Sequence, residues 1–134
     1  MSAATDWSQR AAEALERTDI MVLATVDADS GTWASPVQFQ AAEDFALSFL
    51  SHPDTRHGRN IARDPHVAVA IYSWPGPDGG NLGLQITGHA STDGPPSGGW
   101  QRYAIRPTEI WCFDSRIDHE RHRVGRNRAP AGTK

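Results

Sequence analysis

Six short apolar runs separated by turn-forming residues constrain the fold of this chain more than any other feature. They span residues 20–26, 32–40, 45–50, 66–74, 82–91 and 108–115. Such runs, rich in β-branched and aromatic residues and bounded by Gly, Pro, Asp and Ser, are typical of β-strands. They do not alternate regularly with helices, and the sequence holds neither a GxGxxG nor a Walker A motif. The pattern therefore predicts a mainly β chain with short helices, folded as a small antiparallel barrel.

Two short helices complete the expected fold. Asp6 can cap a first helix within residues 1–19, where apolar residues recur with helical period. A second helix is expected from about Thr55 to Asp64, because the proline that follows disfavours helical geometry. A chain of 134 residues is long enough for one domain with one core. We expect residues 116–134 to form a flexible tail on that domain.

Composition narrows the possible partners. A formal net charge of −3 argues against general nucleic-acid binding, which favours basic domains. The apolar runs are too short to span a membrane, and the N-terminus lacks the basic and apolar regions of a secretion signal. A single cysteine, Cys112, excludes an internal disulfide. We therefore expect a cytoplasmic protein that binds neither nucleic acid nor membrane.

The histidines and two of the tryptophans are candidate ligand-binding groups. None of the spacings among the six histidines matches a known metal-binding motif, so no metal site is expected. Trp74 and Trp100 flank loops rich in Gly and Pro. Each ring could cover a bound ligand or close one end of the barrel.

The start of the second expected helix concentrates groups that suit a phosphate. A helix N-terminus presents unpaired N–H groups and the positive end of the helix dipole. Thr55, Arg56 and His57 would add hydroxyl and cationic donors at this point. The alternative is a solvated basic helix whose arginines only balance the acidic surface. The residues by themselves leave both interpretations open.

Four segments carry a further signal through their order along the chain. They are LATV and WASPV at 23–26 and 33–37, FALSFL and DTRHGRNI at 45–50 and 54–61, DPHVAVA at 64–70, and LQITGHA at 84–90. Together they resemble the FMN-binding split-barrel family related to pyridoxamine 5'-phosphate oxidase. The resemblance implies a six-stranded antiparallel split β-barrel. It also implies a homodimer with one flavin in each of two clefts between the subunits.

The resemblance further implies which residues bind the cofactor. Ser35, Pro36 and Val37 are expected to line the flavin ring and the ribityl chain. Leu50 and Ser51 are expected near the ribityl chain and the phosphate. Those expected to hold the phosphate are Thr55, Arg56 and His57, and Gln85 would reach the cofactor from the fifth strand.

Two features depart from the family pattern. Relatives commonly carry Lys where this chain has His57, and an imidazole loses its charge near pH 6.5. We therefore expect FMN retention to weaken as the pH rises from about 6 to 8.5. Residues 93–99 form only a short Gly/Pro connector where relatives carry a helical excursion that would build one wall of the cleft.

The expected function is that of an FMN-dependent oxidoreductase acting on an unknown small substrate. In this family the flavin performs the redox chemistry and the protein sets its orientation and electronics. No residue is identified as catalytic. The alternatives are a deazaflavin-dependent reductase and a non-catalytic dimeric protein that binds flavin or another ligand.

Overall fold

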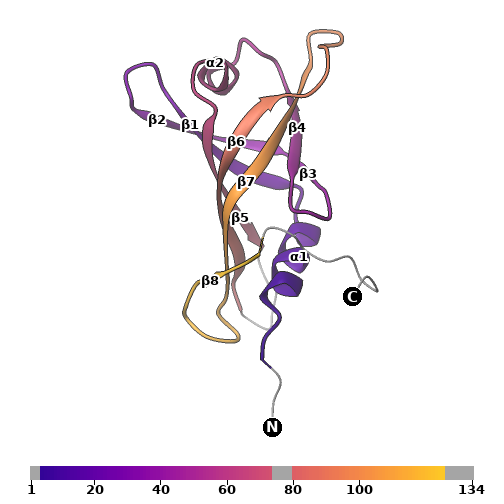
Figure 1. Ribbon diagram of the computed structural model, residues 1–134, viewed down its shortest axis with the longest axis vertical. Helices are drawn as coiled ribbons and strands as arrows, with labels where there is room; N and C mark the ends of the chain where they lie inside the picture. The colour runs from indigo at the N-terminus through magenta and orange to yellow at the C-terminus, as the bar shows by residue number, and fades with distance from the viewer. Residues whose placement is uncertain (1–3, 74–79, 126–134) are drawn as a thin grey trace.

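The computed structural model describes residues 4–73 and 80–125, which form a curled antiparallel sheet with two short helices (Figure 1). The helices are α1 (Trp7–Arg17) and α2 (Arg56–Arg63). The strands are β1 (Ile20–Val26), β2 (Thr32–Gln38), β3 (Gln40–Ala41), β4 (Leu47–Ser51), β5 (His66–Ser73), β6 (Leu82–Thr92), β7 (Gln101–Asp114) and β8 (His122–Arg123). Their order across the sheet is β2-β1-β5-β6-β7-β4-β3, and β8 pairs with β7. The mainly β split-barrel fold is therefore confirmed.

The strands differ from the sequence prediction at three places. The expected strand 32–40 divides into β2 and β3 at Phe39, whose N–H donates to the Asp19 carbonyl. The strand expected at 45–50 starts two residues later, at Leu47, because Phe45 adopts a positive φ of 69° in the preceding turn. The expected strand 108–115 is only the second half of β7. Trp74, the last residue expected in the fourth strand, lies outside the described residues.

A β-bulge lies where the unpredicted first half of β7 meets the predicted second half. Pro107 is the last residue of the first half, and proline removes a donor from a β-ladder. The register between β6 and β7 shifts at Thr87/Gly88, and Pro107 lies opposite Gly88 directly beside this shift. Bulges tolerate such residues, so β7 continues through the proline.

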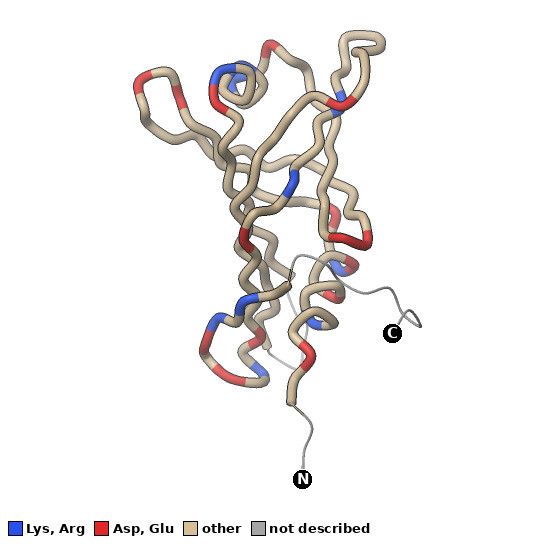
Figure 2. The backbone as a smooth tube through the Cα atoms, in the orientation of Figure 1, with Lys and Arg blue, Asp and Glu red and all other residues tan. Residues whose placement is uncertain are grey.

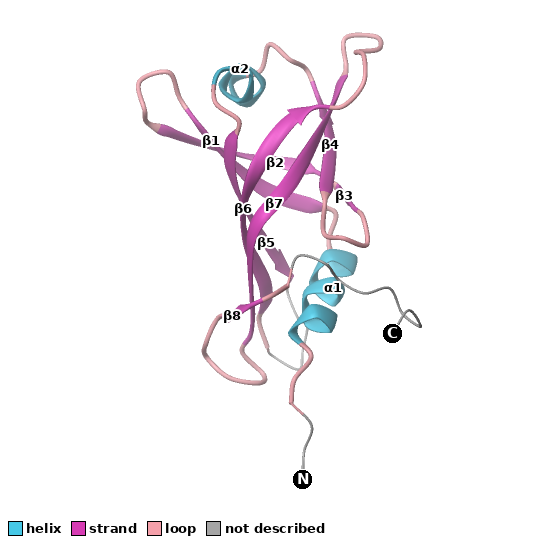
Figure 3. Ribbon diagram, in the orientation of Figure 1, coloured by secondary structure: helices cyan, strands magenta, loops and turns pink. Residues whose placement is uncertain are grey.

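The core lies on one face of the sheet. In β5 every second residue is buried, and the same alternation continues in β6 and β7. Helix α1 places Ala11 and Ala14 against this core, and Asp6 caps the helix by accepting a hydrogen bond from the Gln9 N–H. Figure 3 shows α1 near one end of the sheet and α2 near the other.

The opposite face of the sheet carries a continuous row of paired residues. From β2 to β8 the row is Pro36, Val22, Ala70, Gln85, Trp111 and Arg123. Directly paired residues on neighbouring strands point to the same face. Around this row Ile20, Val22 and Tyr72 are 42%, 43% and 50% exposed. The outer face is therefore apolar and open over β1 and β5.

The folded domain extends past residue 116, where the flexible tail was expected to start. Residues 122–123 form β8, and Val124 is buried while its N–H donates to the Ile110 carbonyl. The His122 ring stacks on Trp7 with the ring centroids 3.8 Å apart. The segment 116–125 thus belongs to the folded domain, whereas residues 126–134 lie outside the described residues.

A buried carboxylate joins this end of β7 to α1. Asp114 is almost fully buried and accepts hydrogen bonds from Arg10 Nη2 at 2.7 Å and from Arg116 Nη2 at 3.2 Å. These arginines hold the pKa of Asp114 below its usual value, although burial alone would raise it.

Within the described part of the chain, neither helix is long and apolar enough to cross a membrane. The cytoplasmic location and the absence of a nucleic-acid partner stay predictions.

Candidate functional site

Helix α2 begins in a tightly packed corner after β4. The Thr55 hydroxyl caps the helix: its oxygen accepts from the Gly58 N–H at 3.0 Å and its O–H donates to the His52 carbonyl at 2.8 Å. Gly58 is required here, because a Cβ at this position would lie 2.7 Å from the Pro53 carbonyl oxygen. The first N–H groups of a helix have no partner within the helix. Those of Arg56 and His57 are therefore available to an anion at this corner.

His57 turns toward the barrel. Its Nε2 lies 2.6 Å from the Ser51 hydroxyl, which is buried at the end of β4. Burial lowers the pKa of His57, because a desolvated imidazole disfavours its charged form. The uncharged ring is a weaker phosphate ligand than the lysine it replaces. The loss of charge expected between pH 6 and 8.5 is thus displaced to lower pH.

Arg56 is held by the β1–β2 turn. Its Nε and Nη2 donate to the two carboxylate oxygens of Asp27 at 3.1 and 2.7 Å, and its guanidinium lies 4.0 Å from the centre of the Trp33 ring. The Arg56 and Asn60 hydrogen bonds lower the pKa of Asp27 to about 2. The arginine expected to hold the phosphate therefore already has an anionic partner.

An open cleft lies along the outer side of β4. Its volume is about 770 Å³. The residues lining it include Leu50, Trp100 and Arg102, and the exposed fractions of Leu50 and Trp100 are 58% and 49%. The Trp100 ring packs on the His52 ring with the ring centroids 4.1 Å apart, and Arg102 Nη2 donates to the Ser48 hydroxyl at 3.1 Å. The short connector 93–99 contributes Pro95 and Ser97, so this chain builds a cleft wall without a helical excursion.

The three candidate residues on β2 do not share a face. Ser35 and Val37 pair with Leu23 and Met21 and are half-buried, whereas Pro36 is exposed on the outer face. Alternation along a strand separates neighbouring side chains in this way. A ligand over β2 would thus meet Pro36 through its side chain and the other two largely through their main chain.

Gln85 is exposed on β6, three strands away from β2 in the sheet order. Strands β1 and β5 lie between β2 and β6, which separates these two strands by about 14 Å. The Gln85 side-chain oxygen accepts a hydrogen bond from Arg121 Nε, and the Arg121 guanidinium lies 5.1 Å from the centre of the Phe113 ring. Arg121 was missed because it lies in the segment expected to be a tail. The sequence carries no local signal that places it beside Gln85.

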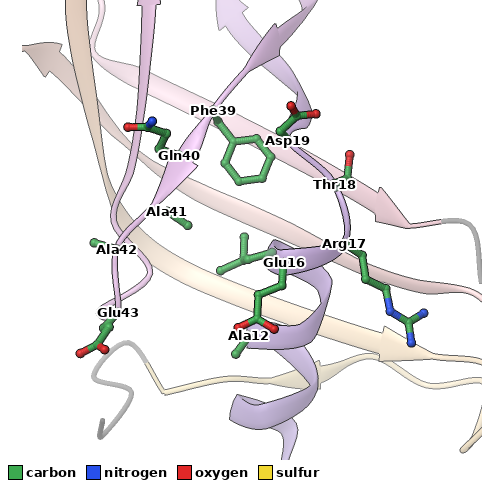
Figure 4. A pocket seen from close by; sticks show the side chains of 11 residues that line it. Ala12, Glu16, Arg17, Thr18, Asp19, Phe39, Gln40, Ala41, Ala42 and Glu43 are labelled. Atoms are coloured by element: carbon green, nitrogen blue, oxygen red, sulfur yellow. The ribbon is translucent and has the colours of Figure 1, made fainter. Parts of the chain in front are cut away.

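A second depression lies between α1 and β3, and none of the candidate residues lines it. Its volume is also about 770 Å³, and Leu15, Phe39 and Glu43 are among its lining residues (Figure 4). A third depression, of about 500 Å³, is lined by Arg56 together with Asp27 and Asn60. Among the candidate residues only Leu50 lines the cleft along β4, so the candidate site is the β4–α2 corner with the cleft that it meets at Leu50.

A family model described as pyridoxamine 5'-phosphate oxidase matches residues 8–127. The chain belongs to this family. The match covers helix α2, all the described strands and all of α1 except Trp7, so the resemblance deduced from the four segments is confirmed. No curated protein matches the sequence significantly.

Several solved structures resemble this one. A heme-binding protein from Mycobacterium smegmatis superposes with a TM-score of 0.77 at 15% identity, over 93% of this chain and 60% of that chain. A pyridoxamine 5'-phosphate oxidase-like protein from Listeria innocua gives a TM-score of 0.68 at 22% identity, over 79% of this chain and 97% of that chain. An F420 reductase gives a TM-score of 0.58 at 21% identity, over 75% of this chain and 94% of that chain. At these identities the likeness establishes the fold alone.

Proposed function

We propose that this chain binds FMN and acts as an oxidoreductase on a small substrate. The observation that carries the proposal is the placement of Leu50, Ser51, Thr55 and His57 along one continuous corner, from the last two residues of β4 to the first turn of α2. A cleft of about 770 Å³ adjoins it. That volume is within the range of cofactor and ligand sites in proteins.

The residues of this corner suit the two ends of a flavin mononucleotide. The N–H groups of Arg56 and His57 at the start of α2 would hold the phosphate. Leu50 and Trp100 offer exposed apolar surface for the ring. When bound, the flavin would supply the redox chemistry. Arg102 and the Ser48 hydroxyl would orient a polar substrate group from the floor of the cleft.

We further propose that the protein works as a homodimer through its outer sheet face. Exposed apolar side chains over β1 and β5 favour a covered surface. Val22→Glu should then yield a monomer in sedimentation velocity, whereas Ile117→Glu, at an exposed apolar residue of the β7–β8 loop, should leave the dimer intact. A wild-type protein that is monomeric at micromolar concentration would refute the dimer.

The cofactor proposal has a direct test. Purified protein should absorb in the flavin bands and release FMN on heating. Leu50→Asp should abolish FMN binding, because it puts a carboxylate into the proposed ring surface, whereas Ile117→Asp should bind FMN normally. Wild-type protein that remains colourless after incubation with excess FMN would contradict the proposal.

Two other ligands are supported by particular likenesses. The similarity to an F420 reductase supports a deazaflavin-dependent reductase, and the similarity to a heme-binding protein supports a non-catalytic ligand-binding role. Titration of the colourless protein with F420 and with hemin separates these alternatives, because each ligand changes its absorbance on binding.

A further inference from the structure

The pair formed by Arg56 and Asp27 has a consequence for the charge of the ligand. It rests on the proposed function, because it concerns the ligand end that α2 would hold. The Arg56 side chain is 49% exposed, while that of Asp27 is only 14% exposed. Acidic residues of the β1–β2 turn lie next to the basic residues of α2 in Figure 2.

The carboxylate of Asp27 is held by Asn60 as well as by Arg56. Asn60 Nδ2 donates to Asp27 Oδ1 at 2.8 Å, and the same amide donates to Thr25 Oγ1 at 3.0 Å. Asn60 and Thr25 are both buried. Because buried neighbours anchor it, the carboxylate cannot easily turn away when an anion approaches.

Arg56 is restricted on two sides. Its Nε/Nη2 edge is occupied by Asp27, and Trp33 covers one face of the guanidinium. An anion seeking the usual two-pronged contact on that edge must displace the carboxylate. Two further arginines of α2 are directed elsewhere: Arg59 donates to the Asp54 carbonyl, and Arg63 Nη2 donates to Asn60 Oδ1 at 2.7 Å.

We propose that Asp27 determines which anion the start of α2 accepts, by keeping Arg56 in a neutral pair. The remaining attraction comes from the N–H groups and the dipole of the helix start, equivalent to roughly half a positive charge. Because attraction scales with charge, neutralising Arg56 costs the doubly charged phosphate monoester of FMN more binding free energy than it costs a singly charged group, such as a phosphodiester or a carboxylate. FMN would bind, but with an affinity reduced by competition with Asp27.

The test compares a monoester with a diester on the intact protein. Methyl phosphate and dimethyl phosphate are titrated at pH 8, where the monoester is close to doubly charged, and the backbone amide resonances of residues 56–58 are followed by NMR. Asp27→Asn should raise the affinity for methyl phosphate roughly three- to tenfold relative to dimethyl phosphate, the range expected on releasing one partly exposed arginine. Asp29→Asn is the matched control: its carboxylate lies in the same turn but bonds the Gly31 N–H, so the ratio should barely change.

A double variant makes the test independent of how well one variant folds. Asp27→Asn combined with Arg56→Gln removes both charges of the pair and should return the ratio to that of the wild type. The proposal is overturned if Asp27→Asn leaves the ratio unchanged or lowers it, or if residues 56–58 respond to neither probe in any variant.

Flavin binding separates this inference from the proposed function. FMN affinity should rise in Asp27→Asn by the same factor, while riboflavin, which lacks the phosphate, should bind equally well to both proteins. A protein that responds to the phosphate probes as described but ignores FMN would sustain the role of Asp27 and refute the FMN proposal. Equal changes for FMN and riboflavin would refute the role of Asp27 and leave the FMN proposal standing.

Discussion

Gly58→Ala tests the packing that creates the corner at the start of α2. In an unobstructed helix this change stabilises a protein by about 1 kcal/mol, because alanine has the higher helix propensity. Here the added methyl group would lie 2.7 Å from the Pro53 carbonyl oxygen and 3.0 Å from that of His52. Both are main-chain atoms, and the Thr55 hydroxyl hydrogen-bonds the His52 carbonyl and the Gly58 N–H. Relief therefore requires the whole 52–55 loop to move.

The expected outcome is a net loss of stability. Overpacking against such a rigid neighbour costs about 2–3 kcal/mol. Subtracting the propensity gain leaves the free energy of unfolding lower by about 1–2 kcal/mol. For a domain of this size that corresponds to a fall in Tm of about 4–8 °C.

Thermal and urea unfolding followed by circular dichroism measure this change. Ala62→Gly, at an exposed position of the same helix, measures the difference in helix propensity between alanine and glycine within α2. Its loss of about 1 kcal/mol, added to the loss in Gly58→Ala, gives the cost of the close contact alone. A higher Tm for Gly58→Ala would show that the loop yields freely and that the corner is not rigid.

Three further outcomes are expected. Asp114→Ala should lower the free energy of unfolding by about 2–3 kcal/mol in urea, because two arginines lose a buried carboxylate, while Glu13→Ala stays within about 0.5 kcal/mol. Burial raises the pKa of Cys112 to about 12, so its thiol should react with Ellman's reagent at pH 8 only after unfolding; reaction in the native state would contradict its placement. Because burial lowers the pKa of His57, FMN affinity should fall as the pH rises through values below 6.5 and be flat from pH 7 to 8.5. His57→Ala keeps only the pH dependence that comes from the phosphate's own ionisation at about pH 6, so the wild type should show an additional fall relative to this variant. A fall centred above pH 7 in the wild type would refute this.

The order of elements could be predicted because its signals are local. The cap at Asp6, the turn at Gly31 and the proline after Asp64 each act within a few residues of the boundary they set. The extent of β7 could not be predicted in the same way. Whether Pro107 ends a strand or sits at a bulge depends on its partner Gly88, a residue of a different strand.

The same difference between local and long-range signals applies to the candidate site. Leu50, Ser51, Thr55 and His57 lie together because they are neighbours in sequence, so a local motif is enough to predict their proximity. The contact of Arg56 with Asp27 joins residues 29 positions apart, and that of Gln85 with Arg121 joins residues 36 positions apart. Both depend on how the sheet curls and where the last segment folds back. No property of the individual residues specifies either contact.

The contact between Arg10 and Asp114 also fixes the order in which the chain can fold as it is synthesised. These residues are 104 positions apart, and the apolar side of α1 packs on β5, β6 and β7. At about 5–20 residues per second, β7 follows α1 out of the ribosome after roughly 5–20 s. The β1–β2 hairpin can form early, because its strands are joined by a short turn. Helix α1 is made first, yet it is among the last elements to find its native partners. Until then its alanine-lined face is exposed to chaperones and to other nascent chains.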